Sequence, residues 1–288
     1  MSRWHADRVV GATLMSATII CGGLVLLIVW FLVLGALPAF DAGRLTDLFV
    51  DDRWQPGSAR DPQFGVLPML AASIMVTMLA IAIAAPLGLA GAVFHQFYLL
   101  QSVRKWNRRA LELLAGVPSV VFGFWGLTVL VPAINRIHPP GQSLLAASLV
   151  LALMILPTVA LTAQSALQAV PESQLLAAAG LGLGRARTIL SIALPAARSG
   201  IVGGAFLATA RAIGETMAVV MVCGNIAKYP GSVFDPVRPV TATIALEMGY
   251  ATASHKALLY AAGLLLVLVT AALVGWLAFR KNAAPCRA

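Results

Sequence analysis

Residues 171–195 read PESQLLAAAGLGLGRARTILSIALP, and they separate two long apolar segments of the chain. A proline at the first helical position and an acid close to the positive helix end favour a short helix over about 171–179. We expect a second short helix over 185–193, which Leu194 and Pro195 stop just before the next apolar segment. Between the two helices, a sharp reversal is made possible by Gly180, Gly182 and Gly184.

The predicted helix pair carries small apolar side chains on its surface, which are Leu175, Leu176 and Ala179 in the first helix and Ile189 and Ile192 in the second. A projecting helix pair of this kind fits the groove of a partner protein. An amphipathic connector that lies on a lipid surface would show the same pattern. The residues alone leave both interpretations open.

The rest of the chain is too apolar for a soluble protein. Apolar residues make up 60% of the sequence and charged residues 11%, whereas a soluble domain carries about 25% charged residues. Six apolar segments are each long enough to cross about 30 Å of hydrocarbon as a helix, and they occupy roughly 11–37, 66–98, 110–133, 143–165, 199–226 and 257–279. They lack the alternation of barrel strands, so the sequence predicts an all-α membrane protein with six transmembrane helices. Within these segments, we expect close helix packing at Gly116, Gly123, Gly126, Gly203 and Gly204.

The distribution of basic residues predicts the orientation of these helices. Lys and Arg are concentrated in the segments that lie inside when the N-terminus is inside, above all in the cluster Arg104, Lys105, Arg108 and Arg109. The positive-inside rule therefore predicts that both termini are cytoplasmic. The same asymmetry accounts for the net charge of +9 without a nucleic-acid partner.

We expect two regions along the chain. Residues 1–65 hold the first helix, which is far longer than the apolar part of a signal peptide, and an outside loop. Residues 66–281 hold five helices and the inside loop at about 166–198. In the last outside segment, Val240–Tyr250 is apolar enough for a short interfacial helix.

The inside loop resembles a motif of permease subunits of binding-protein-dependent ABC importers. That motif reads EAA, three residues, G, nine residues, I, one residue, LP, and the positions that match it here are Ala177, Ala178, Gly182, Ile192, Leu194 and Pro195. Leu176 stands where the family usually has Glu, which removes a polar contact usually ascribed to that position. The resemblance implies a type-1, MetI-like permease fold in the inner membrane, and a coupling helix that sits in a cleft of an ATPase subunit.

Three further segments are similar to phosphate importer permeases, and they are Glu112–Phe124, Met154–Thr158 and Arg211–Val219. Such permeases pair as two sisters, PstC and PstA, and Phe64–Pro68 and Val222–Asn225 make this chain more similar to PstC. The resemblance implies a PstA-like second permease, a PstB-like ATPase dimer and a PstS-like periplasmic phosphate-binding protein as partners. ATP would be used by the ATPase, and this chain would bind no cofactor itself.

Arg211 and Glu215 are ionisable residues within the fifth apolar segment. A charge in the middle of a bilayer costs about 2.5–3.5 kcal/mol on insertion scales, so such residues face protein, water or one another. Four residues apart on a helix, the two share one face and can pair. In one interpretation Arg211 lines an anion path, and Glu215 holds Arg211 in place, keeps the anion from binding too tightly or joins a gate. The hydroxyls of Thr216 and Ser119 would be further donors on this path. In the other interpretation, Arg211 and Glu215 form an ion pair that only fixes helix packing.

Signatures of catalysis and metal binding are absent from the sequence. There is no Gly-Lys dipeptide and hence no phosphate-binding P-loop, and the four histidines are scattered without ligand spacing (His5, His95, His138 and His255). We therefore predict a transport subunit and not an enzyme. Other readings stay open: a permease for another oxyanion such as sulfate or molybdate, an ion-driven secondary transporter, or a membrane scaffold or sensor.

Overall fold

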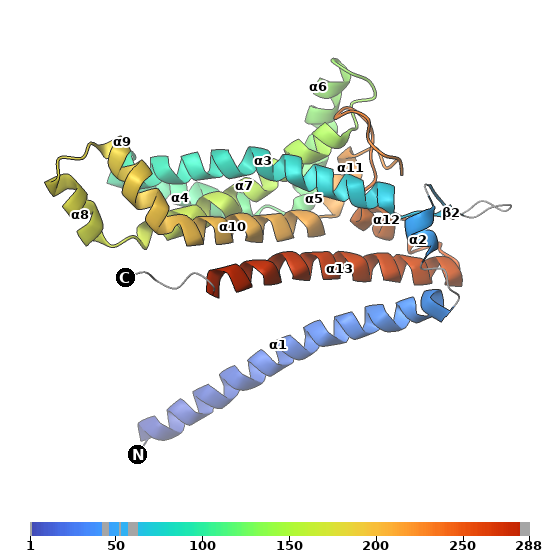
Figure 1. Cartoon of the computed structure of the whole chain (residues 1–288), viewed down its shortest axis with the longest axis horizontal. Helices are drawn as coiled ribbons and strands as arrows, with labels where there is room; N and C mark the ends of the chain where they lie inside the picture. The colour runs from blue at the N-terminus through green and yellow to red at the C-terminus, as the bar shows by residue number, and fades with distance from the viewer. Residues whose placement is uncertain (1, 42–45, 52, 57–62, 283–288) are drawn as a thin grey trace.

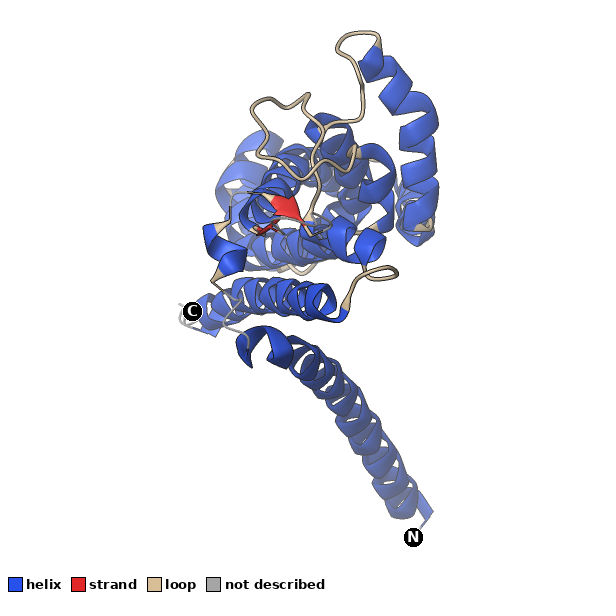
Figure 2. Cartoon of the chain, turned by 90° about the vertical axis from the view of Figure 1, so that its right-hand side faces the viewer, coloured by secondary structure: helices blue, strands red, loops and turns tan. Residues whose placement is uncertain are grey.

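The computed structural model describes residues 2–41, 46–51, 53–56 and 63–282, and the regular secondary structure of this part is helical apart from one small hairpin (Figures 1 and 2). Five long helices match the first, second, fourth, fifth and sixth predicted spans: α1 (Ser2–Asp41), α3 (Leu67–Phe97), α7 (Leu144–Gln168), α10 (Leu194–Gly214) and α13 (Ala253–Asn282). Within the described residues, five helices are long and apolar enough to cross a membrane, or six if one bent pair counts as a span.

The predicted third span, 110–133, is wrong in its start and in its continuity. A helix already begins at Gln101, so the basic cluster predicted in a loop lies on α4 (Gln101–Gly116). The chain then bends by 89° and continues as α5 (Ser119–Trp125), a π-helical turn η1 (Gly126–Leu130) and α6 (Val131–Asn135). Pro118 explains the break, because proline forces the residue before it out of the helical region, and Val117 is extended with ψ 130°.

The predicted fifth span, 199–226, is wrong at both of its ends. It starts earlier, because α9 (Arg185–Thr188) and a π-helical turn η2 (Ile189–Ala193) run directly into α10. It also ends earlier, because α10 stops at Gly214. Pro195 therefore does not stop the second short helix as expected. Proline lacks an N–H and crowds the preceding turn, and the wider π turn just before Pro195 relieves this conflict.

The axes of α3, α7, α10 and α13 are roughly aligned and define two ends of the molecule (Figure 1). One end carries α8 (Glu172–Gly180), α9, the start of α1 and the end of α13, and is called the α8 end. The other, the hairpin end, carries α2 (Asp47–Val50), α12 (Val240–Glu247) and the antiparallel strands β1 (Trp54–Gln55) and β2 (Gln63–Phe64). The short helix expected over 240–250 is thus confirmed as α12.

The packing centre of the bundle is α7, which lies against α3 and α10. Its fully buried side chains include Leu151, Met154 and Ile155. Glycines let neighbouring helices approach closely, since a β-carbon on Gly88 would lie 2.8 Å from a Val159 methyl. The apolar cluster around α7 holds the helices that carry the candidate site.

Among its residues with described side chains, helix α1 packs on the rest of the molecule at the hairpin end. There, Ala36 and Ala39 are buried, and Phe31 meets Tyr260 of α13 edge-on at 5.5 Å between ring centroids. Farther along, α1 diverges from α13 (Figure 1), and its apolar side chains are exposed. A polar solvent would not tolerate such a surface, whereas lipid or another membrane helix would.

Candidate functional site

A gap between α10 and α11 (Met217–Val222) holds two of the predicted path residues. Helix α10 ends at Gly214, Glu215 is extended with φ −68° and ψ 133°, and Thr216 is also non-helical with φ −121° and ψ −62°. The Oε1 atom of Glu215 accepts a hydrogen bond from the backbone N–H of Ala218 at 3.2 Å. The carboxylate thus satisfies a backbone group at the start of α11 and lies at the positive end of that helix.

The ion pair between Arg211 and Glu215, one of the two interpretations of these charges, is not formed. The two residues would share a face only on one continuous helix, and α10 ends between them. Arg211 lies in the last turn of α10 with an exposed side chain, and within the part of the chain that the structure describes it makes no hydrogen bond or ion pair. Of the two interpretations of these charges, the packing ion pair is therefore excluded in this conformation.

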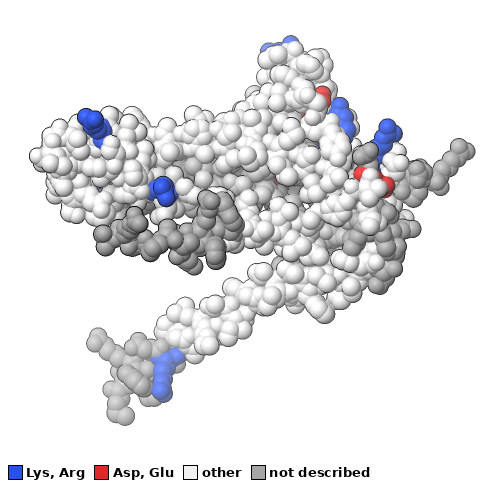
Figure 3. Space-filling model, in the orientation of Figure 1, with Lys and Arg blue, Asp and Glu red and all other residues white. Residues whose placement is uncertain are grey.

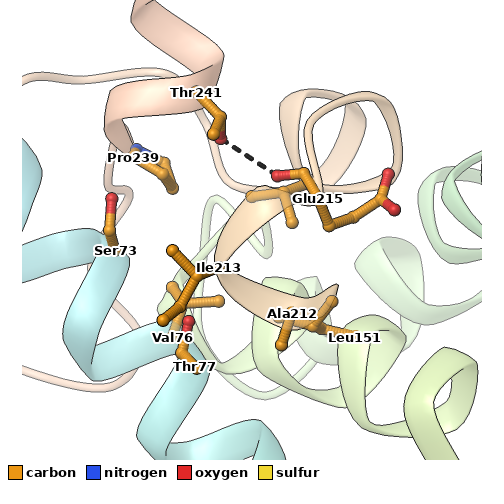
Figure 4. A pocket seen from close by; sticks show the side chains of 10 residues that line it. Ser73, Val76, Thr77, Leu151, Ala212, Ile213, Glu215, Pro239 and Thr241 are labelled. Atoms are coloured by element: carbon orange, nitrogen blue, oxygen red, sulfur yellow. Dashed lines mark hydrogen bonds between the residues drawn. The ribbon is translucent and has the colours of Figure 1, made fainter. Parts of the chain in front are cut away.

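A small pocket opens beside the gap, at the junction of α3, α10 and α12 (Figure 4). The hydroxyl of Thr241 on α12 donates to the backbone carbonyl of Glu215 at 3.0 Å, and Ser73 and Thr77 line the pocket from α3. Figure 4 shows the Glu215 carboxylate turned away from the α3 side chains. The pocket has room for about one water molecule, so it does not enclose a polyatomic anion.

Ser119 begins α5, which lies directly against α11. A β-carbon on Gly123 would lie 2.8 Å from the Cα atom of Ala218, and one on Gly126 would lie 3.0 Å from a Val222 methyl. This register makes the two short helices run in the same direction. Ser119 and the gap residues before α11 therefore lie at the same ends of neighbouring helices, and each follows a break in its span.

The glycines expected to mark close packing fall into two groups. Gly123, Gly126 and Gly204 touch neighbouring helices, as predicted, whereas a β-carbon on Gly116 or Gly203 would meet nothing within 4 Å. Composition alone does not separate these groups, because the distinction depends on which face of each helix meets a neighbour. The glycine prediction is thus confirmed for the first three and wrong for the other two.

The predicted helix pair at the α8 end projects from the bundle (Figure 1). Ala178 is buried, while Leu176 and Ala177 are exposed. Gly182 has φ +72°, a conformation that side chains disfavour, and its N–H donates to the carbonyl of Ala179 to close the helix. Leu175, expected to be exposed, is instead partly buried and packs against an apolar cluster, as Leu194 does. Ile192 is half-buried.

Leu181 is the most exposed side chain of this turn, at 80% of its full accessibility, and sequence reasoning overlooked it. It follows the last residue of α8 and lies beside Gly182, where the chain reverses. Its position at the tip of the reversal was the signal that could have identified it. Together, Leu176 and Leu181 form an apolar tip on the helix pair.

A second polar cluster lies at the hairpin end and was not predicted. The buried carboxylate of Glu247 on α12 accepts hydrogen bonds from Trp54 Nε1 at 2.7 Å, Arg238 at 2.6 Å and His255 Nε2 at 2.9 Å. Trp54 and Glu247 are 193 residues apart in the sequence. No local spacing could have indicated this contact.

Charge and metal chemistry complete the description of the site. Figure 3 shows few charged side chains over the middle of the bundle, with those in view gathered towards its ends. Among the residues with described positions, no three His, Cys, Asp or Glu side chains are placed to hold a metal ion. The arrangement offers a cation and a carboxylate at a break in a membrane-length helix.

Interrupted membrane-length helices with an ionisable residue at the interruption are the architecture of a membrane transport protein. The family model of binding-protein-dependent transport system inner membrane components matches residues 84–280. The chain belongs to this family of multi-pass inner-membrane proteins, the permease subunits of ABC transporters.

Individual relatives agree with this assignment. A probable ABC transporter permease of Bacillus subtilis, YqgH, is 42% identical over 205 residues, which cover 69% of this chain and 65% of that protein, just under two thirds. The phosphate transport system permease protein PstC of Mesorhizobium japonicum is 34% identical over 82% of this chain and 76% of its own length.

Solved structures show the same fold. A chain of the inward-facing MetNI methionine ABC transporter matches with a TM-score of 0.55 and 18% identity, covering 76% of this chain and 94% of its own. A chain of a bacterial ABC transporter that imports the acidic polysaccharide alginate matches with a TM-score of 0.55 and 13% identity, covering 93% of this chain and 96% of its own. The predicted MetI-like permease fold is thus confirmed.

Proposed function

We propose that this chain is one of two permease subunits in an ATP-driven, binding-protein-dependent importer of inorganic phosphate. The observation that carries the proposal is the similarity, at 31–34% identity over 78–83% of this chain, to several proteins named as phosphate transport permeases. The exposed helix pair at the α8 end supports it, because such a shape suits docking onto a separate ATPase. The chain itself would be a transport subunit and not an enzyme.

The substrate path would pass the gap between α10 and α11. Arg211 supports this role because its guanidinium has no partner among the described residues, and its fork of donors matches the oxygens of an anion. Thr216 and Ser119 would add hydroxyl groups near the two breaks. Since the pocket at the gap holds about one water molecule, we expect a PstA-like second permease to complete the path.

Coupling would take place at the α8 end, which we assign to the cytoplasm together with both termini. The loop that meets a PstB-like ATPase dimer would be formed by Leu176, Ala177, Ala178, Gly182, Ile192, Leu194 and Pro195. The hairpin end would then face the periplasm, where a PstS-like binding protein would deliver phosphate. ATP binding and hydrolysis would bias the permease pair between two states, each open to one side.

Reconstitution with defined partners tests the proposal. The tagged chain is purified gently from the membrane, its companions are identified, and the complex is placed in vesicles with ATP and a binding protein loaded with phosphate, sulfate or molybdate. We expect ATP-dependent uptake of phosphate and recovery of an ATPase. Uptake of sulfate or molybdate alone would reassign the substrate, and uptake without any ATPase would favour an ion-driven transporter.

A further inference from the structure

We propose that Glu247 is a positioning residue, which acts through Arg238 and α12 to fix α11 and the gap before it to the folded segments at the hairpin end. The proposal rests on the proposed function in one respect, that the gap belongs to the transport path. The positioning itself is a statement about geometry and is tested separately.

Glu247 joins segments that are otherwise far apart in the sequence. One of its carboxylate oxygens accepts from Trp54 of β1 and from His255 at the start of α13, and the other accepts from Arg238 in the loop before α12. Glu247 and His255 are 4% and 5% exposed. A carboxylate so deeply buried requires these donors, because an unpaired buried charge is strongly destabilising.

Arg238 extends the cluster to the C-terminal end of α11. Its Nε donates to the backbone carbonyl of Asn225 at 2.7 Å, while another of its nitrogens pairs with Glu247. Asn225 has φ +56°, and its side-chain amide donates to the carbonyl of Val220 within α11. One guanidinium therefore holds both the buried carboxylate and the turn that ends α11, which the single ammonium of a lysine does not reproduce.

The N-terminal end of α11 is held from the same side. Helix α12 begins at Val240, two residues after Arg238, and its Thr241 hydroxyl donates to the carbonyl of Glu215 at 3.0 Å. The N–H of Val240 donates to the Ser73 hydroxyl on α3 at 3.0 Å, which anchors this segment to the bundle. The short helix α11 is thus tied at both ends to a segment that Glu247 holds in place.

The backbone at the gap depends on these ties. Glu215 and Thr216 have non-helical backbone angles, and each keeps one backbone hydrogen bond to a flanking helix. The Glu215 N–H donates to the Ala212 carbonyl at 3.3 Å, and the Thr216 carbonyl accepts from the Val220 N–H at 2.9 Å. The carbonyl of Glu215 is instead held by Thr241 of α12. Since Trp54 of the hairpin also binds Glu247, the hairpin and α11 are parts of one hydrogen-bonded frame. A displacement of the hairpin would therefore also displace the gap residues through this frame.

Two substitutions separate the parts of the frame. Glu247→Gln keeps the size of the side chain but removes the charge that pairs with Arg238. Arg238→Lys keeps a charge for Glu247 but removes the fork that also reaches the Asn225 carbonyl. The control is Glu112→Gln, which breaks the exposed pair of Glu112 with Arg108 on α4 at 2.8 Å.

Hydrogen exchange of the assembled complex in lipid nanodiscs is the first measurement. We expect both variants to speed exchange of amides in Val219–Asn225 and of Val237, whose N–H donates to Cys223, by about tenfold or more. The control should leave these amides unchanged. Arg238→Lys should change the amides of α13 less than Glu247→Gln does.

The outcomes are decisive in either direction. Faster exchange at α11 in both variants supports the proposal. Changes confined to α12, α13 and the hairpin in both variants would overturn it, since Glu247 would then stabilise only its own neighbours. If Glu247→Gln fails to assemble, Arg238→Lys alone decides, and unchanged exchange at α11 in that variant refutes the positioning role.

Uptake measurements then link the frame to transport. For Arg238→Lys in the reconstituted complex, we expect the maximal rate of phosphate uptake to fall while the phosphate concentration for half-maximal uptake stays the same. A change in the half-maximal concentration alone would contradict a positioning role. If the wild-type complex takes up no phosphate, the proposed function fails, while the exchange experiment still decides the positioning claim.

Discussion

Two adjacent glycines on α10 give a matched test of how tightly the site-bearing helices are packed. A β-carbon on Gly204 would lie 2.6 Å from Thr162 Cβ on α7, whereas ordinary van der Waals contact begins at 3.4 Å. It would lie even nearer the Thr162 hydroxyl, which donates to the carbonyls of Thr158 and Val159. Rotation of Thr162 does not move its own Cβ atom, so Gly204→Ala forces the two helices apart.

The expected cost of Gly204→Ala is about 1–3 kcal/mol, the usual range for adding a methyl group to a closely packed interior. Gly203→Ala is the control, because a β-carbon there meets nothing within 4 Å. Helix propensity makes that change neutral or stabilising by up to about 1 kcal/mol. The two neighbouring substitutions should therefore differ by roughly 1–4 kcal/mol in stability, with Gly204→Ala the less stable.

Thermal unfolding of the purified complex in one detergent measures this difference. At about 2–4 °C per kcal/mol, Gly204→Ala should melt several degrees below Gly203→Ala. Phosphate uptake should fall with Gly204→Ala, because the displaced α10 carries Arg211 and leads into the gap. Equal melting temperatures would show that α7 and α10 do not pack as closely as described, and would remove the basis for placing the gap from this contact.

Three further substitutions test the proposed path and coupling loop. Arg211→Gln should abolish phosphate uptake while the complex still assembles, because the guanidinium contributes donors and not packing. Normal uptake would remove Arg211 from the path. The control is Arg198→Gln, a change of an exposed side chain near the opposite end of α10. Gly182→Phe should uncouple ATP hydrolysis from uptake, since φ +72° disfavours a side chain by about 1–2 kcal/mol and the phenyl ring would lie at the docking tip. Coupling equal to that of the wild type would argue against docking there. Leu181→Ser should leave thermal stability unchanged, as this side chain is 80% exposed, but should reduce the ATPase recovered on purification; full recovery would exclude Leu181 from the contact.

The membrane spans were predictable from the sequence because lipid imposes a strong local rule. A segment in hydrocarbon must satisfy its own backbone groups, so a long apolar run becomes a helix whatever surrounds it. Helices α3, α7 and α13 follow the predicted segments within a few residues. The reversal at Gly182 was likewise predictable from local residue types, because Gly180, Gly182 and Gly184 follow a short predicted helix.

The two breaks were not predicted because their causes are partly distant. Pro118 gave a local signal for the break between α4 and α5, but hydropathy averages across it. No comparable signal marks the end of α10 at Gly214. The backbone carbonyl of Glu215 accepts there from the Thr241 hydroxyl, 26 residues farther along the chain.

The candidate site divides in the same way. Arg211 and Glu215 stood out in the sequence because charged residues are costly in a membrane segment. Their relation did not follow from spacing, since a helix end between them prevents the ion pair that a continuous helix would allow. The cluster at Glu247 joins residues up to 193 positions apart, and only folding brings them together.

The sequence by itself determined that this protein lies in a membrane, the approximate place of most of its membrane helices, and the short helix pair at one end. These features depend on hydropathy and on residues close together in the chain. The tertiary structure decided where the third and fifth spans break, which glycines touch a neighbouring helix, and which donors reach the buried carboxylate of Glu247. The reason is physical: a backbone group or charge withdrawn from water takes whichever partner the fold places beside it, and that partner can lie anywhere in the chain.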